Sequence, residues 1–109
     1  RDESFEIISD KILYIQSIGN YLNVFFKTTD KGVKKRTIRN SMGNIWDTLH
    51  KIDFFFQCHR SYIININELE SLKGNSKKLV AKIKNVEETI PIARNHIKEV
   101  KEKAKELFI

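Results

Sequence analysis

Short hydrophobic stretches separated by turn residues recur along the first forty residues of the chain, a pattern that predicts β-strands. Residues 12–17 and 21–28 are the longest such stretches, and residues 5–8 form a shorter one. The Gly19-Asn20 dipeptide separates the two long stretches and predicts a turn between them. The chain therefore begins as a series of short strands joined by tight turns.

A second hairpin is predicted at Asp30-Lys31-Gly32, where we expect Gly32 to supply the positive φ that such turns need. The strand that follows, residues 33–38, is rich in lysine and arginine. Over residues 41–52 the hydrophobic period becomes helical. Ser41 can cap this helix by accepting a backbone N–H, and we expect the helix to end at Asp53.

The second half of the chain is predicted to be β structure followed by a helix. Pro91 cannot donate to a sheet, so its strand should lie at an edge, and Gly74-Asn75 should form a hairpin turn. A helical period over residues 95–107 makes Asn95 the expected N-cap of the last helix. The expected strands are residues 54–56, 62–66, 69–72, 79–83 and 89–93. The pattern thus predicts one mostly β domain over residues 1–109.

Charge narrows the class of partner. The 109 residues include 20 lysines and arginines against 14 acidic residues, a net charge of +6. This balance favours an anionic partner such as nucleic acid, an acidic membrane surface or an acidic protein. No apolar run approaches the roughly 20 residues of a membrane helix. Because the first residue is Arg1 rather than Met, we expect an N-terminal part of a longer protein to precede this domain.

Catalytic and metal-binding patterns are missing from the sequence. The single cysteine, Cys58, excludes a disulfide within the chain and a cysteine-based zinc site. The three histidines do not have the spacing of a metal pair. Cys58 and His59 are adjacent, but neighbouring strand residues point to opposite faces, so they cannot act as a nucleophile and its base. We expect Cys58 to be a buried packing residue, and we expect no enzyme, cofactor or metal.

Several polar side chains fall on predicted turns and strand ends, where binding residues concentrate. Arg60 and Arg94 each follow a hydrophobic strand, and each lies beside a hydrogen-bonding residue, His59 or Asn95. Arginine can bind guanine through two hydrogen bonds, and asparagine can bind adenine in the same way. Asn20 also fits such a role, although an asparagine there could instead adopt the left-handed conformation of a turn. Together these residues indicate a surface that binds nucleic acid.

Three segments resemble a known family. Residues 55–65, Phe-Phe-Gln-Cys-His-Arg-Ser-Tyr-Ile-Ile-Asn, resemble the phenylalanine–x–x–histidine–arginine–serine–tyrosine–hydrophobic–hydrophobic–asparagine core of LytTR-type DNA-binding domains, which are output domains of bacterial transcription regulators. Residues 12–21 are similar to the family's isoleucine–x–tyrosine–isoleucine–glutamate–x–x–x–asparagine–tyrosine segment, and residues 90–94 to its isoleucine–proline–valine–serine–arginine segment. Gln16, Gln57 and Ala93 depart from the residues that are frequent in the family.

The resemblance implies an elongated arrangement of short antiparallel sheets with one short internal helix and a C-terminal helix. It also implies that loops enter successive major grooves of double-stranded DNA and bend it. The DNA-binding residues expected from the motifs and their neighbours are Asn20, Tyr21, His59, Arg60, Arg94 and Asn95. The family further implies a homodimer on paired sites, an N-terminal receiver or sensor region, and a cytoplasmic location with or without a membrane tether.

Two other classes of function fit the same sequence. An RNA-binding β domain would stack bases on exposed aromatic rings. An exposed aromatic pair on one sheet face would favour that class, whereas a dry aromatic core would not. A protein-interaction module could instead use the charged face of the C-terminal helix. Both alternatives are open at this point.

Overall fold

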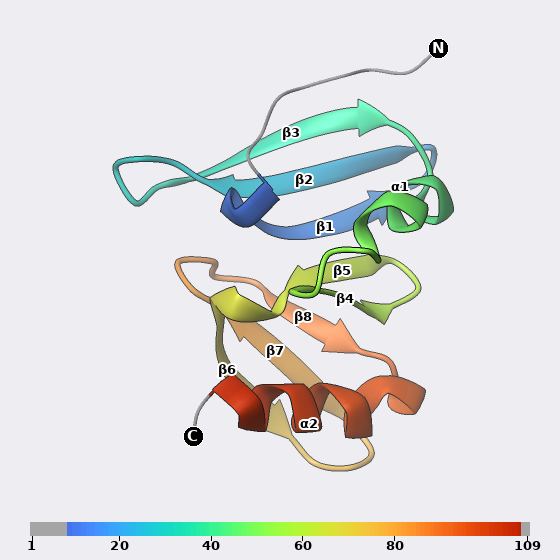
Figure 1. Ribbon diagram of the computed structural model, residues 1–109, viewed down its shortest axis with the longest axis vertical. Helices are drawn as coiled ribbons and strands as arrows, with labels where there is room; N and C mark the ends of the chain where they lie inside the picture. The colour runs from blue at the N-terminus through green and yellow to red at the C-terminus, as the bar shows by residue number, and fades with distance from the viewer. Residues whose placement is uncertain (1–8, 108–109) are drawn as a thin grey trace.

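Two antiparallel sheets form the structure, a computed structural model that describes residues 9–107 (Figure 1). The first sheet has the order β3-β2-β1-β5-β4, and the second has the order β6-β7-β8. The strands are β1 (Ile12–Ile18), β2 (Tyr21–Lys27), β3 (Val33–Arg39), β4 (Phe55–His59), β5 (Tyr62–Asn65), β6 (Leu69–Gly74), β7 (Leu79–Ile83) and β8 (Thr89–Ile92). The helices are α1 (Met42–Leu49) and α2 (Ile97–Leu107), with 3-10 turns η1 (Ser9–Lys11), η2 (Ile66–Glu68) and η3 (Arg94–His96). The predicted fold class is confirmed. The strand predicted at residues 5–8 lies outside the described residues.

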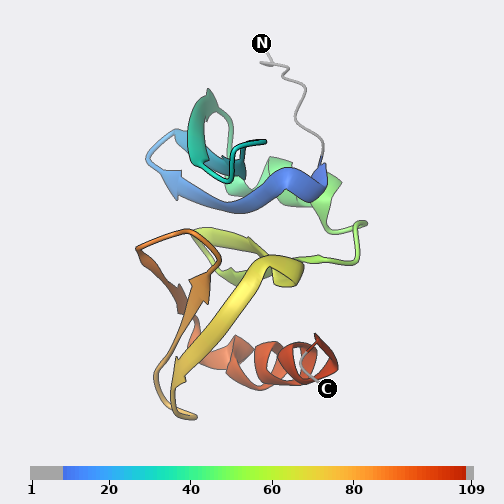
Figure 2. The same cartoon turned by 90° about the vertical axis from the view of Figure 1, so that its left-hand side faces the viewer.

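The first sheet is covered on both faces. On one face, Ile15, Leu22 and Ile63 pack in a core beneath α1. On the other face, Tyr14 and Ile64 join a larger core with the second sheet and α2. Figure 2 shows these layers from the side, with α2 against the second sheet. Because strand residues alternate between faces, one sheet can supply both cores.

Helix α1 begins as predicted but ends early. The Ser41 hydroxyl accepts the Asn44 N–H at 3.1 Å, which confirms the N-cap. The helix ends at Leu49 rather than at Asp53, and the His50 N–H closes it by donating to the Trp46 carbonyl. Ile52 still packs against the same core as Leu49, although it lies outside the helix. Because Ile52 is needed in the core, the helical spacing of hydrophobic residues in the sequence extends beyond the end of α1.

One turn prediction is corrected in detail, and an alternative left open at a second turn is decided. The left-handed residue of the β2–β3 hairpin is Lys31, with φ 68°, and not Gly32. Thr28 and Gly32 pair through their backbones, so the loop has three residues, and such loops place their third residue in the left-handed region. At the β1–β2 turn the left-handed residue is Gly19, with φ 57°, and not Asn20. Glycine in the first position of a two-residue turn is the arrangement of type II′ hairpins.

The C-terminal helix also starts differently from the prediction. Arg94–His96 form a 3-10 turn, so Ala93 rather than Asn95 occupies the N-cap position, and no side chain caps it. Asn95 is therefore left exposed on the surface instead of being used as a cap. Pro91 lies in β8, which is an edge strand of the second sheet as predicted. The predicted β6–β7 hairpin around Gly74 is present as well.

Gly74 gives the first testable prediction. Its φ is 130°, and an added Cβ would lie 2.0 Å from the Lys78 carbonyl oxygen. Gly74→Ala must therefore distort the β6–β7 hairpin, and we expect it to lower the free energy of unfolding by about 2–4 kcal/mol. Gly43→Ala is the matched control, because Gly43 lies in α1 with open space around it. We expect that change to stabilise by about 0.5–1 kcal/mol. Urea denaturation measures the free energy of unfolding of both variants, and equal changes in the two would refute the argument.

Candidate nucleic-acid interface

Three turns from distant parts of the chain meet along one edge of the molecule. They are the β1–β2 turn, the β4–β5 turn and the junction of β8 with η3, all at the right in Figure 1. The Ser17 N–H donates to the Ser61 carbonyl at 2.9 Å, which ties the first turn to the second. The Ala93 N–H donates to the Cys58 carbonyl at 2.8 Å, which ties the third segment to the second. These backbone hydrogen bonds fix the relative positions of the three turns.

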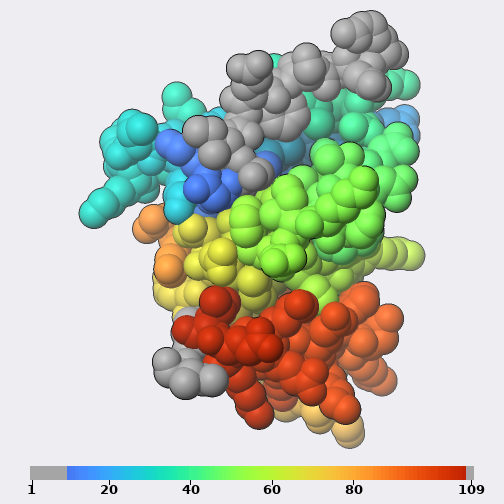
Figure 3. Space-filling view, viewed as in Figure 1, coloured from blue at the N-terminus to red at the C-terminus, as the bar shows by residue number. Residues whose placement is uncertain are grey.

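The six residues predicted from sequence all lie on these three segments. Asn20 and Tyr21 form the β1–β2 tip, and both are exposed. His59, Arg60 and Asn95 line one hollow of about 390 Å³ together with Gln57, Ala93 and His96. Figure 3 shows the β4–β5 turn and η3 next to each other on the right of the molecule. Arg94 is exposed in η3 but does not line the hollow.

Arg39 extends the basic edge and was not among the predicted site residues. It is the last residue of β3 and lies opposite Tyr21 in the β2–β3 pairing. Within residues 9–107, no hydrogen bond or ion pair holds the side chains of Arg39, Arg60 and Arg94. Their guanidinium groups are therefore available to an anion. The hairpin register, counted back from the three-residue loop, is the sequence feature that could have placed Arg39 beside Tyr21.

His59 is held in one tautomer by its own turn. Its Nδ1 lies 3.1 Å from the Ser61 amide nitrogen, which can only donate. Nδ1 must therefore accept, and the ring proton is on Nε2. The ring also packs edge-on against Tyr62, with centroids 5.7 Å apart. His59 thus presents a neutral N–H donor in a fixed orientation beside Arg60.

A row of hydrogen-bonded side chains supports the turns from the sheet. The Thr37 hydroxyl donates to Asn23 at 2.7 Å, Asn23 lies 3.4 Å from Gln16, and Gln16 donates to the Tyr62 hydroxyl at 2.9 Å. The row crosses β3, β2, β1 and β5. A glutamate at position 16, as is frequent in the resembling family, could only accept. Gln16 both accepts and donates, so the Tyr62 hydroxyl keeps its own proton to donate elsewhere.

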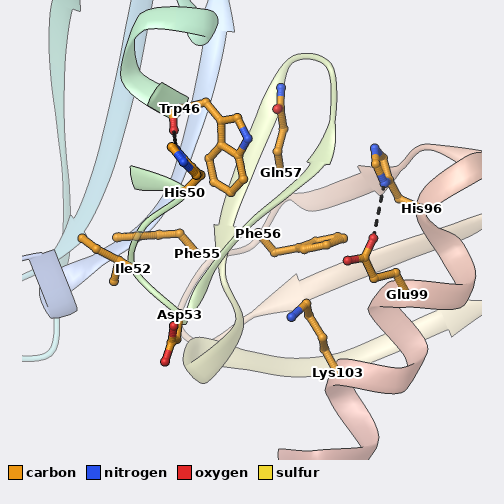
Figure 4. Close-up of a pocket in the computed structure, with 10 residues that line it drawn as sticks. All are labelled: Trp46, His50, Ile52, Asp53, Phe55, Phe56, Gln57, His96, Glu99 and Lys103. Carbon is orange, nitrogen blue, oxygen red and sulfur yellow. Dashed lines mark hydrogen bonds and ion pairs between the residues drawn. The ribbon is translucent and has the colours of Figure 1, made fainter. Parts of the chain in front are cut away.

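A second hollow of about 390 Å³ lies between α1, β4 and α2 (Figure 4). Phe56 lies on its wall, with the His96 ring edge-on at 5.7 Å and the Lys103 ammonium 5.7 Å from the Phe56 centroid. His96 also faces Glu99, with Nδ1 and Oε1 3.9 Å apart. Asp53 and Glu99 line the hollow together with Lys103, so side chains of both charges meet there.

Cys58 is a packing residue, as predicted. Its side chain is fully buried, and Sγ lies 3.7 Å from the Pro91 carbonyl oxygen. Burial raises the pKa of the Cys58 thiol to about 12, so the reactive thiolate is scarce at neutral pH. Within residues 9–107, no three metal-ligating side chains lie close enough to hold an ion. No helix within residues 9–107 is long and apolar enough to cross a membrane.

The fold is a β domain whose edge turns carry exposed polar and basic side chains. The family model of the LytTr DNA-binding domain matches residues 2–105, so the chain belongs to the LytTR family of DNA-binding domains. This family is a DNA-binding one acting in transcription regulation and is not a catalytic family. The resemblance found in the sequence is confirmed.

A solved structure has the same fold. It is the LytTr DNA-binding domain of a protein described as a methyl-accepting/DNA response regulator from Bacillus cereus. The match has a TM-score of 0.65 and 16% sequence identity, and it covers 89% of this chain and 84% of that one. No curated protein matches the chain. The similarity to the solved structure therefore concerns the fold.

The buried thiol predicts a dependence of stability on pH. In the unfolded chain a cysteine ionises near its ordinary pKa of 9.0, whereas the folded thiol stays protonated to about pH 12. Ionisation therefore favours the unfolded state as the pH rises through that interval, by up to about 1.4 kcal/mol per pH unit. Cys58→Ala should cost about 1–2 kcal/mol at pH 7, and this cost should shrink above pH 9 and reverse before pH 12.

Chemical denaturation of both proteins at several pH values measures the difference. Burial also raises the pKa of Tyr14 to about 12, but Tyr14 is common to both proteins, so its contribution cancels. A difference that stays constant up to pH 11.5 would contradict the prediction.

Proposed function

We propose that this domain binds specific sequences in double-stranded DNA by inserting its edge turns into successive major grooves. The observation that carries this proposal is the alignment of three turns, each bearing an exposed polar or basic side chain, on one edge locked by backbone hydrogen bonds. A rigid row of turns can follow the grooves of a duplex without a recognition helix. Membership of a DNA-binding family supports the same partner.

Each turn has a proposed role. Arg60 and Arg94 bind guanine or clamp phosphate, and Asn20 and Asn95 bind adenine. His59 donates its Nε2 proton to a base or phosphate oxygen. Tyr21 contacts the DNA beside Asn20 at the β1–β2 tip. The hollow beside His59, Arg60 and Asn95 gives a base edge or phosphate room to enter.

We further propose that residues 1–109 are one domain, the C-terminal output part of a longer bacterial response regulator. The similarity to a domain of a response regulator supports this place in a two-component system. An N-terminal receiver or sensor region would then supply the input, and a homodimer would occupy paired sites. The regulator would act in the cytoplasm, free or tethered to the membrane, and would need no cofactor.

The RNA-binding alternative has less support than binding of duplex DNA. Stacking of unpaired bases requires exposed aromatic rings. Tyr14 and Phe25 instead stack on each other at 4.2 Å against the core. Tyr21, which is 46% exposed, is the one exposed aromatic side chain among residues 9–107. The protein-interaction alternative has less support, because the family model that matches the chain is that of a DNA-binding domain.

The first functional prediction concerns salt. With roughly four to six phosphate contacts, the slope of log affinity against log salt should be about −4 to −5 for duplex DNA. Filter binding over a range of salt concentrations measures it. Duplex RNA and single strands at equal salt serve as controls, and we expect both to bind more weakly. A slope near zero for duplex DNA would remove DNA as the partner.

A second prediction separates the edge arginines from the helix lysines. Arg60→Ala or Arg94→Ala should cost about 1–3 kcal/mol on a duplex selected from random sequences and reduce the preference for it. Lys105→Ala is the control, because Lys105 is exposed near the C-terminal end of α2, away from η3. It should change affinity little. Circular dichroism must show that each variant is folded. Folded arginine variants that keep the parent's preference would refute the assignment.

A further inference from the structure

The β1–β2 tip carries an apolar surface that folding does not require. Among residues 9–107, three large hydrophobic side chains are exposed: Ile18 at 55%, Tyr21 at 46% and Leu107 at 41%. A single exposed apolar residue is ordinary. Here two of the three are directly opposite each other, because Ile18 pairs with Tyr21 across the β1–β2 hairpin. They lie on the edge proposed to meet DNA.

Basic groups flank this apolar pair on both sides. Tyr21 is opposite Arg39 in β3, so Ile18, Tyr21 and Arg39 form a row across three strands. On the other side of β1, the Ser17 N–H binds the Ser61 carbonyl, which places the turn that carries Arg60 beside Ile18. Ile18 is thus an apolar residue between two segments that carry arginines, β3 and the β4–β5 turn.

Few groups of a DNA duplex can make a favourable contact with an exposed isoleucine. Phosphate and sugar oxygens gain nothing from an isoleucine. In the major groove the apolar group is the 5-methyl of thymine, which protein side chains recognise by apolar contact. The flanking arginines can hold the phosphates on either side while the tip enters the groove. Ile18 is also fixed by strand pairing, so its position is set before DNA arrives.

We propose that Ile18 is a specificity-determining residue that contacts the 5-methyl group of a thymine in the major groove. This inference rests on the proposed function and adds to it a base preference that none of the motif residues supplies. Tyr21 supports the contact from the opposite strand of the hairpin.

Replacing thymine by deoxyuridine tests the inference, because the two bases differ only in that methyl group. A duplex is first selected from random DNA with the parent chain, and each thymine is then replaced singly. For the parent we expect a loss of about fourfold at one or two positions, the effect of one buried methyl group. For Ile18→Ala we expect weaker binding of the thymine duplex and no further loss on replacement. Ile18→Val should keep the dependence on thymine.

Leu107→Ala is the matched control, since Leu107 is similarly exposed but lies at the end of α2. It should keep the parent's pattern at every position. A replacement profile that is the same in folded Ile18→Ala and in the parent overturns the inference. So does a parent with no dependence on any thymine, the result expected if Ile18 were a wedge between base pairs or a contact for another protein. In both cases the DNA-binding function stands, whereas failure to select any duplex overturns the proposed function as well.

Discussion

Strand β5 is the element on which the rest of the structure depends, because its two faces belong to different cores. Ile63 points into the core beneath α1, Ile64 points into the core shared with the second sheet, and both are fully buried. Asn65 then fixes the end of the strand: its amide donates to the Ile12 carbonyl at 2.9 Å and its oxygen accepts the Asn67 N–H. At the other end, Ser61 anchors the β1–β2 turn. One short strand thus joins both cores to the binding edge.

Most of the local structure could be predicted from the sequence, because alternation and turn residues act over a few positions. The non-local arrangement could not. Nothing in the period of residues 62–66 says that β5 lies between β1 and β4, since strand pairing depends on tertiary packing. The errors have the same origin. Ile52 continued the helical period because it packs in the core from a turn, and Asn95 was expected to be the N-cap of a helix whose N-cap is Ala93, two residues earlier.

The candidate site was predictable only in part, for a related reason. His59 and Arg60 are neighbours in the sequence, and the motif marks them directly. Arg39 and Ile18 become part of the edge only through the register of β1 with β2 and of β2 with β3. A three-residue loop rather than a two-residue loop at residues 29–31 decides which β3 residue lies opposite Tyr21. A register error of one residue would have moved Arg39 to the other face.

The treatment of polar groups separates scaffold from site. Among the described residues, every buried side-chain nitrogen and oxygen has a hydrogen-bond partner, and Asn65 has two. Such pairing is what a buried polar group needs to avoid a cost to folding. Along the edge the reverse holds: within residues 9–107, no carboxylate forms an ion pair with the guanidinium groups of Arg39, Arg60 and Arg94. Like charges held near one another disfavour folding slightly, and a polyanion removes that repulsion on binding. The protein therefore satisfies its polar groups where the fold needs them and leaves its cations unpaired where DNA is proposed to bind.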